Sequence, residues 1–322
     1  MTIPLVELKS LTRHFKMPGK LFSREKPVLR ALDGVDLQIF RGETLGLVGE
    51  SGCGKSTLAR TLIRLYTPTS GQILFDGQDI SSLPEHELMP FRRRMQMIFQ
   101  DPYSSLNGRM PVHELIAEPL VIAKIGTAKS RRAKVDELLT RVGLSPDHAN
   151  RFAHEFSGGQ RQRIGIARAI ALEPELVLCD EPISALDVSI QAQVVNMLRD
   201  LQAAFGLTYL FITHDLSMVR YISDRIGVMY LGKIVELAGN DALYENPRHP
   251  YTRALLSSIP VPDPRAKPKA EEVLGEIPSP MDIPSGCRFR TRCPLATARC
   301  AAEEPELRDM GGGHMAACHF AQ

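Results

Sequence analysis

Long apolar runs, excess charge and a secretion signal are all missing from this sequence. No apolar stretch approaches the ~20 residues that a membrane-spanning helix needs. Lys and Arg number 39 against 37 Asp and Glu, so the net charge of +2 indicates neither a nucleic-acid-binding field nor an acidic tail. Met1–Pro4 lead directly into strand-like sequence rather than a basic-then-apolar signal. We therefore expect a soluble, cytosolic protein that only other subunits could hold at a membrane.

The length and the order of segments predict an α/β protein with an appended C-terminal part. At roughly 100–200 residues per domain, 322 residues suggest one large domain with an appendage, or two domains. Strand-like apolar runs alternate with helical periodicity, which predicts a mostly parallel sheet covered by helices. The strand-like runs are residues 6–8, 35–40, 44–48, 176–179 and 209–213, and the helical ones are 57–65, 112–123, 135–142 and 190–205.

Three stretches depart from this alternation. The basic, proline-bearing stretch 16–30 is expected to be a loop. A helix-rich insertion over about residues 100–160 predicts a helical subdomain. Nine prolines between Pro247 and Pro284 block regular helix and sheet and predict an extended linker. We therefore expect one large domain at 1–245, followed by a linker and a cysteine-rich extension at 246–322.

A glycine-rich segment between a predicted strand and a predicted helix has the spacing of a phosphate-binding loop. Its residues are Gly49, Glu50, Ser51, Gly52, Cys53, Gly54, Lys55 and Ser56, with Thr57 next in the helix. The glycines let backbone N–H groups point at phosphate oxygens, and the helix start adds partial positive charge. Lys55 is expected to reach the β- and γ-phosphates, and the Ser56 hydroxyl to coordinate Mg²⁺. The alternative is an ordinary glycine-rich turn.

The apolar run Leu176–Cys179 ends in two carboxylates. Asp180 is expected to hold Mg²⁺, directly or through water, while Glu181 orients and deprotonates the attacking water. Alone, the pattern would equally fit a strand that happens to end in acidic residues. After a phosphate loop, it indicates the hydrolytic part of an ATP site.

The segment Phe156–Arg163 opens a helix with a serine and two glycines. Ser157 can cap this helix, while Gly158 and Gly159 leave backbone N–H groups accessible, which predicts a second anion-binding helix start. Because the phosphate loop already serves the chain's own nucleotide, the second site suggests a partner's nucleotide. The alternative is a simple capped helix.

Together these motifs resemble the nucleotide-binding subunits of ABC transporters. The resemblance covers residues 5 to about 245 and rests on Gly49–Ser56, Gln100, Ser157–Gln160, Asp180-Glu181, Ser184–Asp187 and His214. It implies a P-loop ABC ATPase core in which an antiparallel β subdomain and a helical subdomain accompany the parallel sheet. It also implies that two such domains enclose two ATP molecules, each phosphate loop facing the other subunit's signature serine and glycines.

The same resemblance implies several further site roles. Gln100 would contact Mg²⁺ or the lytic water and relay the nucleotide state to membrane subunits, and His214 would contact the γ-phosphate. Ser157, Gly159 and Gln160 would contact the partner's nucleotide. Asp187 and its neighbours would line the seam between the two domains. Phe15 would stack on adenine.

Four of the six cysteines gather near the C-terminus, at Cys287, Cys293, Cys300 and Cys318. In a cytosolic protein, four soft thiolates suit Zn²⁺ or an iron–sulfur cluster better than disulfides. Zinc ribbons usually show closely spaced pairs, and the wider gaps here leave room for loops around a larger cluster. Four free thiols in a small domain are the alternative.

The residues around these cysteines resemble the C-terminal extension of oligopeptide and dipeptide importer ATPases. The resemblance rests on His249–Arg253, Cys287–Phe289 and Arg292–Pro294. It implies peptide import, with a 4Fe-4S cluster as the first choice at the cysteines and Zn²⁺ as the second. Ala31–Asp36 looks most like the second of the two importer ATPases, which implies a heterodimer.

The implied partners are a second ATPase subunit, two membrane-spanning permease subunits and, indirectly, an extracytoplasmic substrate-binding protein. The chain would then work at the cytoplasmic face of the inner membrane, without nucleic acid. The alternatives are an importer for nickel or glutathione, a soluble ABC ATPase acting on ribosomes or DNA, and a redox- or metal-responsive regulator. Soluble ABC ATPases usually carry two nucleotide domains or long coiled coils, and this chain has neither.

Overall fold

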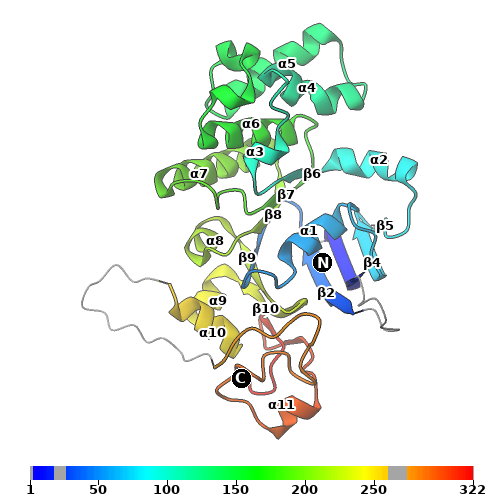
Figure 1. Cartoon of the computed structure of the whole chain (residues 1–322), viewed down its shortest axis with the longest axis vertical. Coiled ribbons are helices and arrows are strands. Elements are labelled where there is room, and N and C mark those ends of the chain that lie inside the picture. The colour runs from blue at the N-terminus through cyan, green and yellow to red at the C-terminus, as the bar shows by residue number, and fades with distance from the viewer. Residues whose placement is uncertain (1–2, 18–26, 260–273, 322) are drawn as a thin grey trace, which may run out of the picture. The chain divides into compact units, whose positions relative to one another are not determined.

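The computed structural model of the chain describes residues 3–17, 27–259 and 274–321 (Figure 1). It divides into two compact units. The first unit is Met1–Ile39, Leu45–Ser82 and Thr213–Gln322, and the second is Phe40–Thr44 and Leu83–Ile212. Over the described ranges, no helix combines the length and the apolar character needed to cross a membrane.

An antiparallel sheet opens the first unit, as the family resemblance implies. Its strand order is β2-β1-β4-β5, from β1 (Val6–Lys16), β2 (Val28–Ile39), β4 (Ser70–Phe75) and β5 (Gln78–Asp79). β1 pairs with both β2 and β4. Backbone hydrogen bonds therefore keep the long strands β1 and β2 extended even at polar positions such as Thr12 and Arg13. The loop prediction for residues 16–30 is therefore wrong at residue 16 and at 28–30, and residues 18–26 lie outside the described part of the chain.

A second set of strands in the first unit supports the phosphate loop. β3 (Thr44–Val48) pairs in parallel with β9 (Arg225–Tyr230), and β9 pairs antiparallel with β10 (Lys233–Gly239). All five residues of β3 are buried, as its continuous apolar run predicts. The chain then enters α1 (Lys55–Leu62), which ends near Arg64, a residue in the left-handed region at φ 58°. The remaining helices of this unit before residue 247 are α8 (Leu216–Ile222) and α9 (Asn240–Glu245).

The proline-rich stretch contains a helix that the sequence analysis excluded. Pro250 is the first residue of α10 (Pro250–Ser257), a position where a missing N–H costs nothing. Burial lowers the pKa of His249 to about 3, so its neutral Nδ1 accepts a hydrogen bond from the Tyr251 N–H at 3.0 Å. This cap starts the helix. The prediction counted prolines without asking where they stand, and a proline in the first turn of a helix does not interrupt it. Residues 260–273 lie outside the described ranges.

The C-terminal extension is joined to the first unit through β10. Buried Glu236 accepts hydrogen bonds from the backbone N–H groups of Arg248 (2.6 Å) and His249 (3.0 Å). Its carboxylate also pairs with His314 at 2.6 Å. The extension adds α11 (Ala298–Ala302), β11 (Arg308–Asp309) and β12 (Met315–Ala316), and β12 pairs with β10. In Figure 1 the red C-terminal strands accordingly lie beside β10.

The second unit combines parallel strands with the predicted helical insertion. β6 (Met95–Ile98), β7 (Leu176–Asp180) and β8 (Thr208–Ile212) pair in parallel in the order β6-β7-β8. Buried apolar faces pack α4 against α5 and α6, as their 3.6-residue periodicity predicts. The helical elements are α2 (Glu85–Arg94), α3 (Pro102–Ser105), α4 (Val112–Ile122), α5 (Ala128–Arg141), η1 (Pro146–Asn150), η2 (Ala153–Glu155), α6 (Gly158–Ile170) and α7 (Val188–Phe205).

Candidate ATP-hydrolysis site

The phosphate loop follows β3 and curls around its own lysine. Lys55 Nζ donates hydrogen bonds to the carbonyl oxygens of Gly49 (2.6 Å) and Glu50 (3.0 Å), and the side chain is only 5% exposed. Gly49 and Gly54 have φ values of 148° and 113°, in the region that favours glycine. A Cβ at either position would also collide with a carbonyl oxygen, that of Met229 or Ala31. This close backbone approach gives the loop the tight curl that its spacing predicts.

The start of α1 completes this half of the site. Gly54 occupies the N-cap and supplies no side-chain cap, so the first-turn N–H groups keep the positive end of the helix open to an anion. Ser56 and Thr57 are half-buried in this first turn. The predicted nucleotide residues of the loop therefore lie together, around Lys55.

His214 lies in the same unit as the phosphate loop. The N–H of Thr213, the residue before it, donates to the carbonyl oxygen of Leu47 at 3.3 Å. The chain leading to His214 therefore runs beside the end of β3, from which the phosphate loop departs. His214 itself is exposed.

Phe15 has a more crowded environment than adenine stacking alone would suggest. Its ring contacts Tyr66 edge-on, with centroids 5.4 Å apart. The Arg13 guanidinium lies 4.4 Å from the Phe15 centroid and 5.7 Å from the Tyr66 centroid. The role of Phe15 stays a prediction, with one ring face already covered by Arg13.

In the second unit, strand register brings the hydrolytic side chains together. Ile98 of β6 is the parallel partner of Cys179 of β7, so Gln100 and Glu181 both lie two residues beyond a matched pair. Gln100 Nε2 donates to Glu181 Oε2 at 2.7 Å. Asp180 is completely buried at the end of β7, and Glu181 turns the chain at φ 48°, a costly conformation for a residue other than glycine. The sequence predicted the residues, and the register explains their contact.

The signature serine caps α6 in a reciprocal arrangement. Ser157 Oγ accepts from the Gln160 N–H at 3.4 Å, and the Gln160 side chain accepts from the Ser157 N–H at 3.1 Å. The two glycines differ in their surroundings. A Cβ on Gly158 would meet nothing closer than 3.8 Å, whereas a Cβ on Gly159 would lie 2.7 Å from Ile190 of α7. Gly159 is thus required for packing, a reason that sequence analysis missed.

The four C-terminal cysteines approach one another without forming a metal-binding group. The Cys287 N–H donates to the Cys300 carbonyl oxygen at 2.8 Å. Burial and, to a lesser degree, the nearby Cys300, Cys318 and Cys293 thiols raise the pKa of the Cys287 thiol to about 11. Burial likewise raises the pKa values of Cys293 and Cys318. Within the described ranges, however, no group of three or more His, Cys, Asp or Glu side chains is placed to hold a metal ion, so the side-chain positions do not support the predicted metal site.

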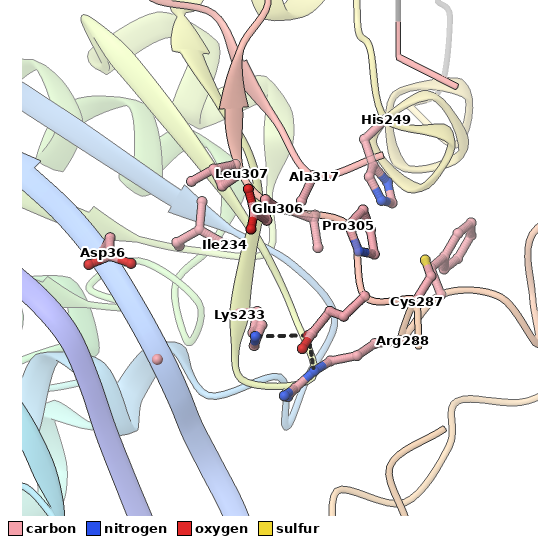
Figure 2. Close-up of a pocket in the computed structure, with 14 residues that line it drawn as sticks. Asp36, Lys233, Ile234, His249, Cys287, Arg288, Pro305, Glu306, Leu307 and Ala317 are labelled. Carbon is pink, nitrogen blue, oxygen red and sulfur yellow. Dashed lines mark hydrogen bonds and ion pairs between the residues drawn. The ribbon is translucent and has the colours of Figure 1, made fainter. Parts of the chain in front are cut away.

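Arg288, beside Cys287, fixes the extension to the first unit. It pairs with Asp33 of β2, donates to the Leu231 carbonyl oxygen, and lies 3.3 Å from Glu304, which also pairs with Lys233 at 2.8 Å. Figure 2 shows Arg288 and Lys233 along the wall of a cavity of about 520 Å³, which Glu304 also lines. The sequence flagged Arg288 only as part of a resemblance, and its partners are distant in sequence.

Known proteins resemble this chain over almost its whole length. Residues 32–184 match the ABC transporter family, and residues 235–300 match the C-terminal region of the oligopeptide/dipeptide transporter family. The chain is 56% identical to the oligopeptide transport ATP-binding protein AppF of Bacillus subtilis (strain 168), with 98% of this chain and 97% of AppF aligned. The chain belongs to the oligopeptide/dipeptide branch of the ABC transporter ATPases.

Further relatives of this ABC ATPase show similar coverage. It is 54% identical to a putative peptide import ATP-binding protein of Brucella ovis, over 98% of this chain and 97% of the relative. Among solved structures, the ATP-binding cassette MJ0796, in a dimer bound to ADP and Pi, matches with a TM-score of 0.65 and 31% identity. The match covers 73% of this chain and 98% of that cassette. The fold is therefore that of an ABC ATPase, and the chain is an ATPase of this family.

The contacts of Gly158 and Gly159 lead to a paired prediction for this ABC ATPase. Gly159→Ala should lower the thermal unfolding midpoint, because overpacking against Ile190 costs about 1–3 kcal/mol. Gly158→Ala is the matched control and should leave the midpoint unchanged. Adding Ile190→Ala should restore much of the loss in Gly159→Ala. Equal losses for the two glycine variants would contradict the packing role.

Proposed function

We propose that this chain binds and hydrolyses ATP to energise the import of di- and oligopeptides. The observation that carries the proposal is the Gln100–Glu181 hydrogen bond of 2.7 Å at the ends of two paired parallel strands. That contact places an amide beside the carboxylate proposed to activate water. Peptides are the proposed cargo because the matched C-terminal region and the relatives belong to peptide transporters.

In the proposed reaction, the phosphate loop and α1 hold the triphosphate, and Lys55 contacts the β- and γ-phosphates. Glu181 accepts a proton from water as the water oxygen attacks the γ-phosphorus. The bond from that phosphorus to the β–γ bridging oxygen breaks, and ADP and phosphate leave. His214 contacts the γ-phosphate and Gln100 orients the water.

Magnesium fits the donor types of the proposed site. Ser56, Gln100 and Asp180 offer hydroxyl, amide and carboxylate oxygens, and Mg²⁺ is commonly held by one or two carboxylates together with substrate phosphates. These three residues would hold the ion, which when bound neutralises phosphate charge. Phe15 would stack on adenine, with Arg13 covering its other face.

The proposed working unit contains a second ATPase subunit. Ser157, Gly159 and Gln160 lie at the capped N-terminus of α6, a position that suits the phosphates of a partner's nucleotide. One solved cassette with this fold, MJ0796, is described as dimeric in two structures. We place the heterodimer beneath two permease subunits at the cytoplasmic face of the inner membrane. An extracytoplasmic binding protein would deliver the peptide to the permease subunits from the opposite side. Nickel and glutathione remain alternative cargoes.

Glu181→Gln tests the proposed base. The variant should bind MgATP within about threefold of the parent, because shape and polarity are kept. Its turnover should fall by about 10²–10⁴, the usual contribution of a general base. Equilibrium nucleotide binding and phosphate release measure the two effects, with exposed Glu137→Gln as the control. Turnover within tenfold of the parent would rule out Glu181 as the base.

Co-purification tests the proposed partners. Tagged chain expressed in its native cell should recover two membrane-spanning subunits and a second ATPase after mild detergent extraction. Peptide uptake into vesicles should then require ATP and be lost with Glu181→Gln. Recovery of ribosomes or DNA in place of membrane subunits would favour the soluble alternative.

We further propose that Cys287, Cys293, Cys300 and Cys318 bind a 4Fe-4S cluster, with Zn²⁺ as the alternative. The all-thiol donor set supports this proposal. The other three thiols also lie near enough to Cys287 to raise its pKa. A four-iron cluster joins thiolates that are farther apart than those around one metal ion. Binding would release thiol protons.

Metal analysis and visible absorption of anaerobically purified protein test the cluster. We expect brown protein with about four irons per chain, and loss of iron in Cys293→Ser but not in Cys179→Ala, which changes a buried β7 residue. Colourless protein that contains zinc would contradict the iron–sulfur proposal and support the zinc alternative. Colourless, metal-free protein would contradict both.

A further inference from the structure

Glu50, the second residue of the phosphate loop, forms an ion pair with Arg292 of the C-terminal extension. Arg292 Nη1 donates to Glu50 Oε2 at 2.6 Å, and Nη2 donates to Glu50 Oε1 at 2.9 Å. Such a two-pronged pair fixes the orientation of both groups as well as their distance. Residues 242 positions apart in the sequence are thereby joined at the proposed nucleotide site.

The pair is sheltered from solvent. Side-chain exposure is 9% for Arg292 and 26% for Glu50. The guanidinium also lies 5.8 Å from the Tyr230 ring centroid and 5.9 Å from that of Phe289. These rings pack on each other and on Tyr251, with centroids 4.7–5.4 Å apart. The aromatic cluster therefore holds Arg292 in place and weakens the screening of its charge.

Two backbone contacts strengthen the same link. The Glu50 N–H donates to Tyr251 Oη at 2.9 Å, and burial keeps this phenol neutral by raising its pKa. The Cys53 carbonyl oxygen accepts from the Gly232 N–H at 2.8 Å, in the turn between β9 and β10. Arg288 of the extension contacts the same turn, because its guanidinium donates to the Leu231 carbonyl oxygen. The extension thus reaches the phosphate loop by three routes.

Glu50 presents an electrostatic problem for a phosphate loop. Its carbonyl oxygen is within 3.0 Å of Lys55 Nζ, so its carboxylate belongs to the loop that is proposed to surround a polyanion. A carboxylate on the loop that surrounds a phosphate repels that phosphate unless a cation neutralises it. Arg292 is the cation that contacts both oxygens of the Glu50 carboxylate.

We propose that Arg292 is a positioning residue of the ATP site, which neutralises Glu50 and holds the phosphate loop ready for nucleotide. The inference rests on the proposed role of Gly49–Ser56. It makes the C-terminal extension a component of nucleotide binding. An alternative in which Arg292 merely fastens the extension predicts lost stability but unchanged nucleotide affinity.

MgADP titration of the full-length chain tests the proposal without turnover. Arg292→Gln should raise the MgADP dissociation constant about tenfold, equivalent to about 1.4 kcal/mol. Adding Glu50→Gln should restore affinity to within about threefold of the parent, because the repelling charge is gone. Arg292→Lys, which keeps the charge, should bind more tightly than Arg292→Gln.

Arg290→Gln is the matched control, because Arg290 lies two residues away and its side chain donates to the carbonyl oxygen and the hydroxyl of Ser285. It should bind MgADP like the parent. Thermal unfolding without nucleotide reports on stability separately. If Arg292→Gln fails to fold, the Glu50→Gln/Arg292→Gln protein carries the test, and affinity tenfold below the parent would contradict the proposal.

Lys55→Ala separates the two hypotheses. If Lys55→Ala binds MgADP as the parent does, the phosphate-loop assignment itself is wrong. If Lys55→Ala loses binding while Arg292→Gln keeps parental affinity, only the role of Arg292 is overturned. Failure of Glu50→Gln to rescue Arg292→Gln would also overturn it, because the charge argument requires that rescue.

Discussion

The phosphate loop depends on a close approach between backbones. Only glycine at positions 49 and 54 allows the loop to lie against the carbonyl oxygens of Met229 and Ala31. That approach closes the curl around Lys55 and brings the loop beside the turn after β9. The same turn is where the C-terminal extension attaches through Arg288. One steric requirement thereby fixes both the shape of the nucleotide loop and its neighbours.

The hydrolytic half follows from a different constraint, the register of parallel strands. Because side chains beyond matched residues emerge at the same edge of a sheet, the pairing of Ile98 with Cys179 brings Gln100 to Glu181. The positive φ of Glu181 then turns the chain at the strand end. The ordered set of motifs predicted both residues, and the pairing of the two strands accounts for their contact.

The C-terminal extension is not separate from the domain that precedes it. Its strands pair with β10, buried Glu236 holds its approach, and Arg292 reaches Glu50. A segment whose composition suggested a linker and a separate cysteine module is thus part of the first unit's architecture. Its cysteines lie close together but not at the spacing of a metal site, so the identity of any bound group rests on their chemistry rather than on their positions.

The sequence by itself determined the ABC ATPase motifs, the alternation of strands and helices, and the family. These depend on residue types at short spacing, where local geometry decides the outcome. It misjudged the lengths of β1 and β2 and missed α10, because cross-strand pairing and an N-terminal cap override composition. Only tertiary structure decided why Gly159 must be glycine and what Arg292 contacts. Those answers depend on Ile190 and Glu50, and packing and ion pairing between distant residues leave no pattern in one sequence.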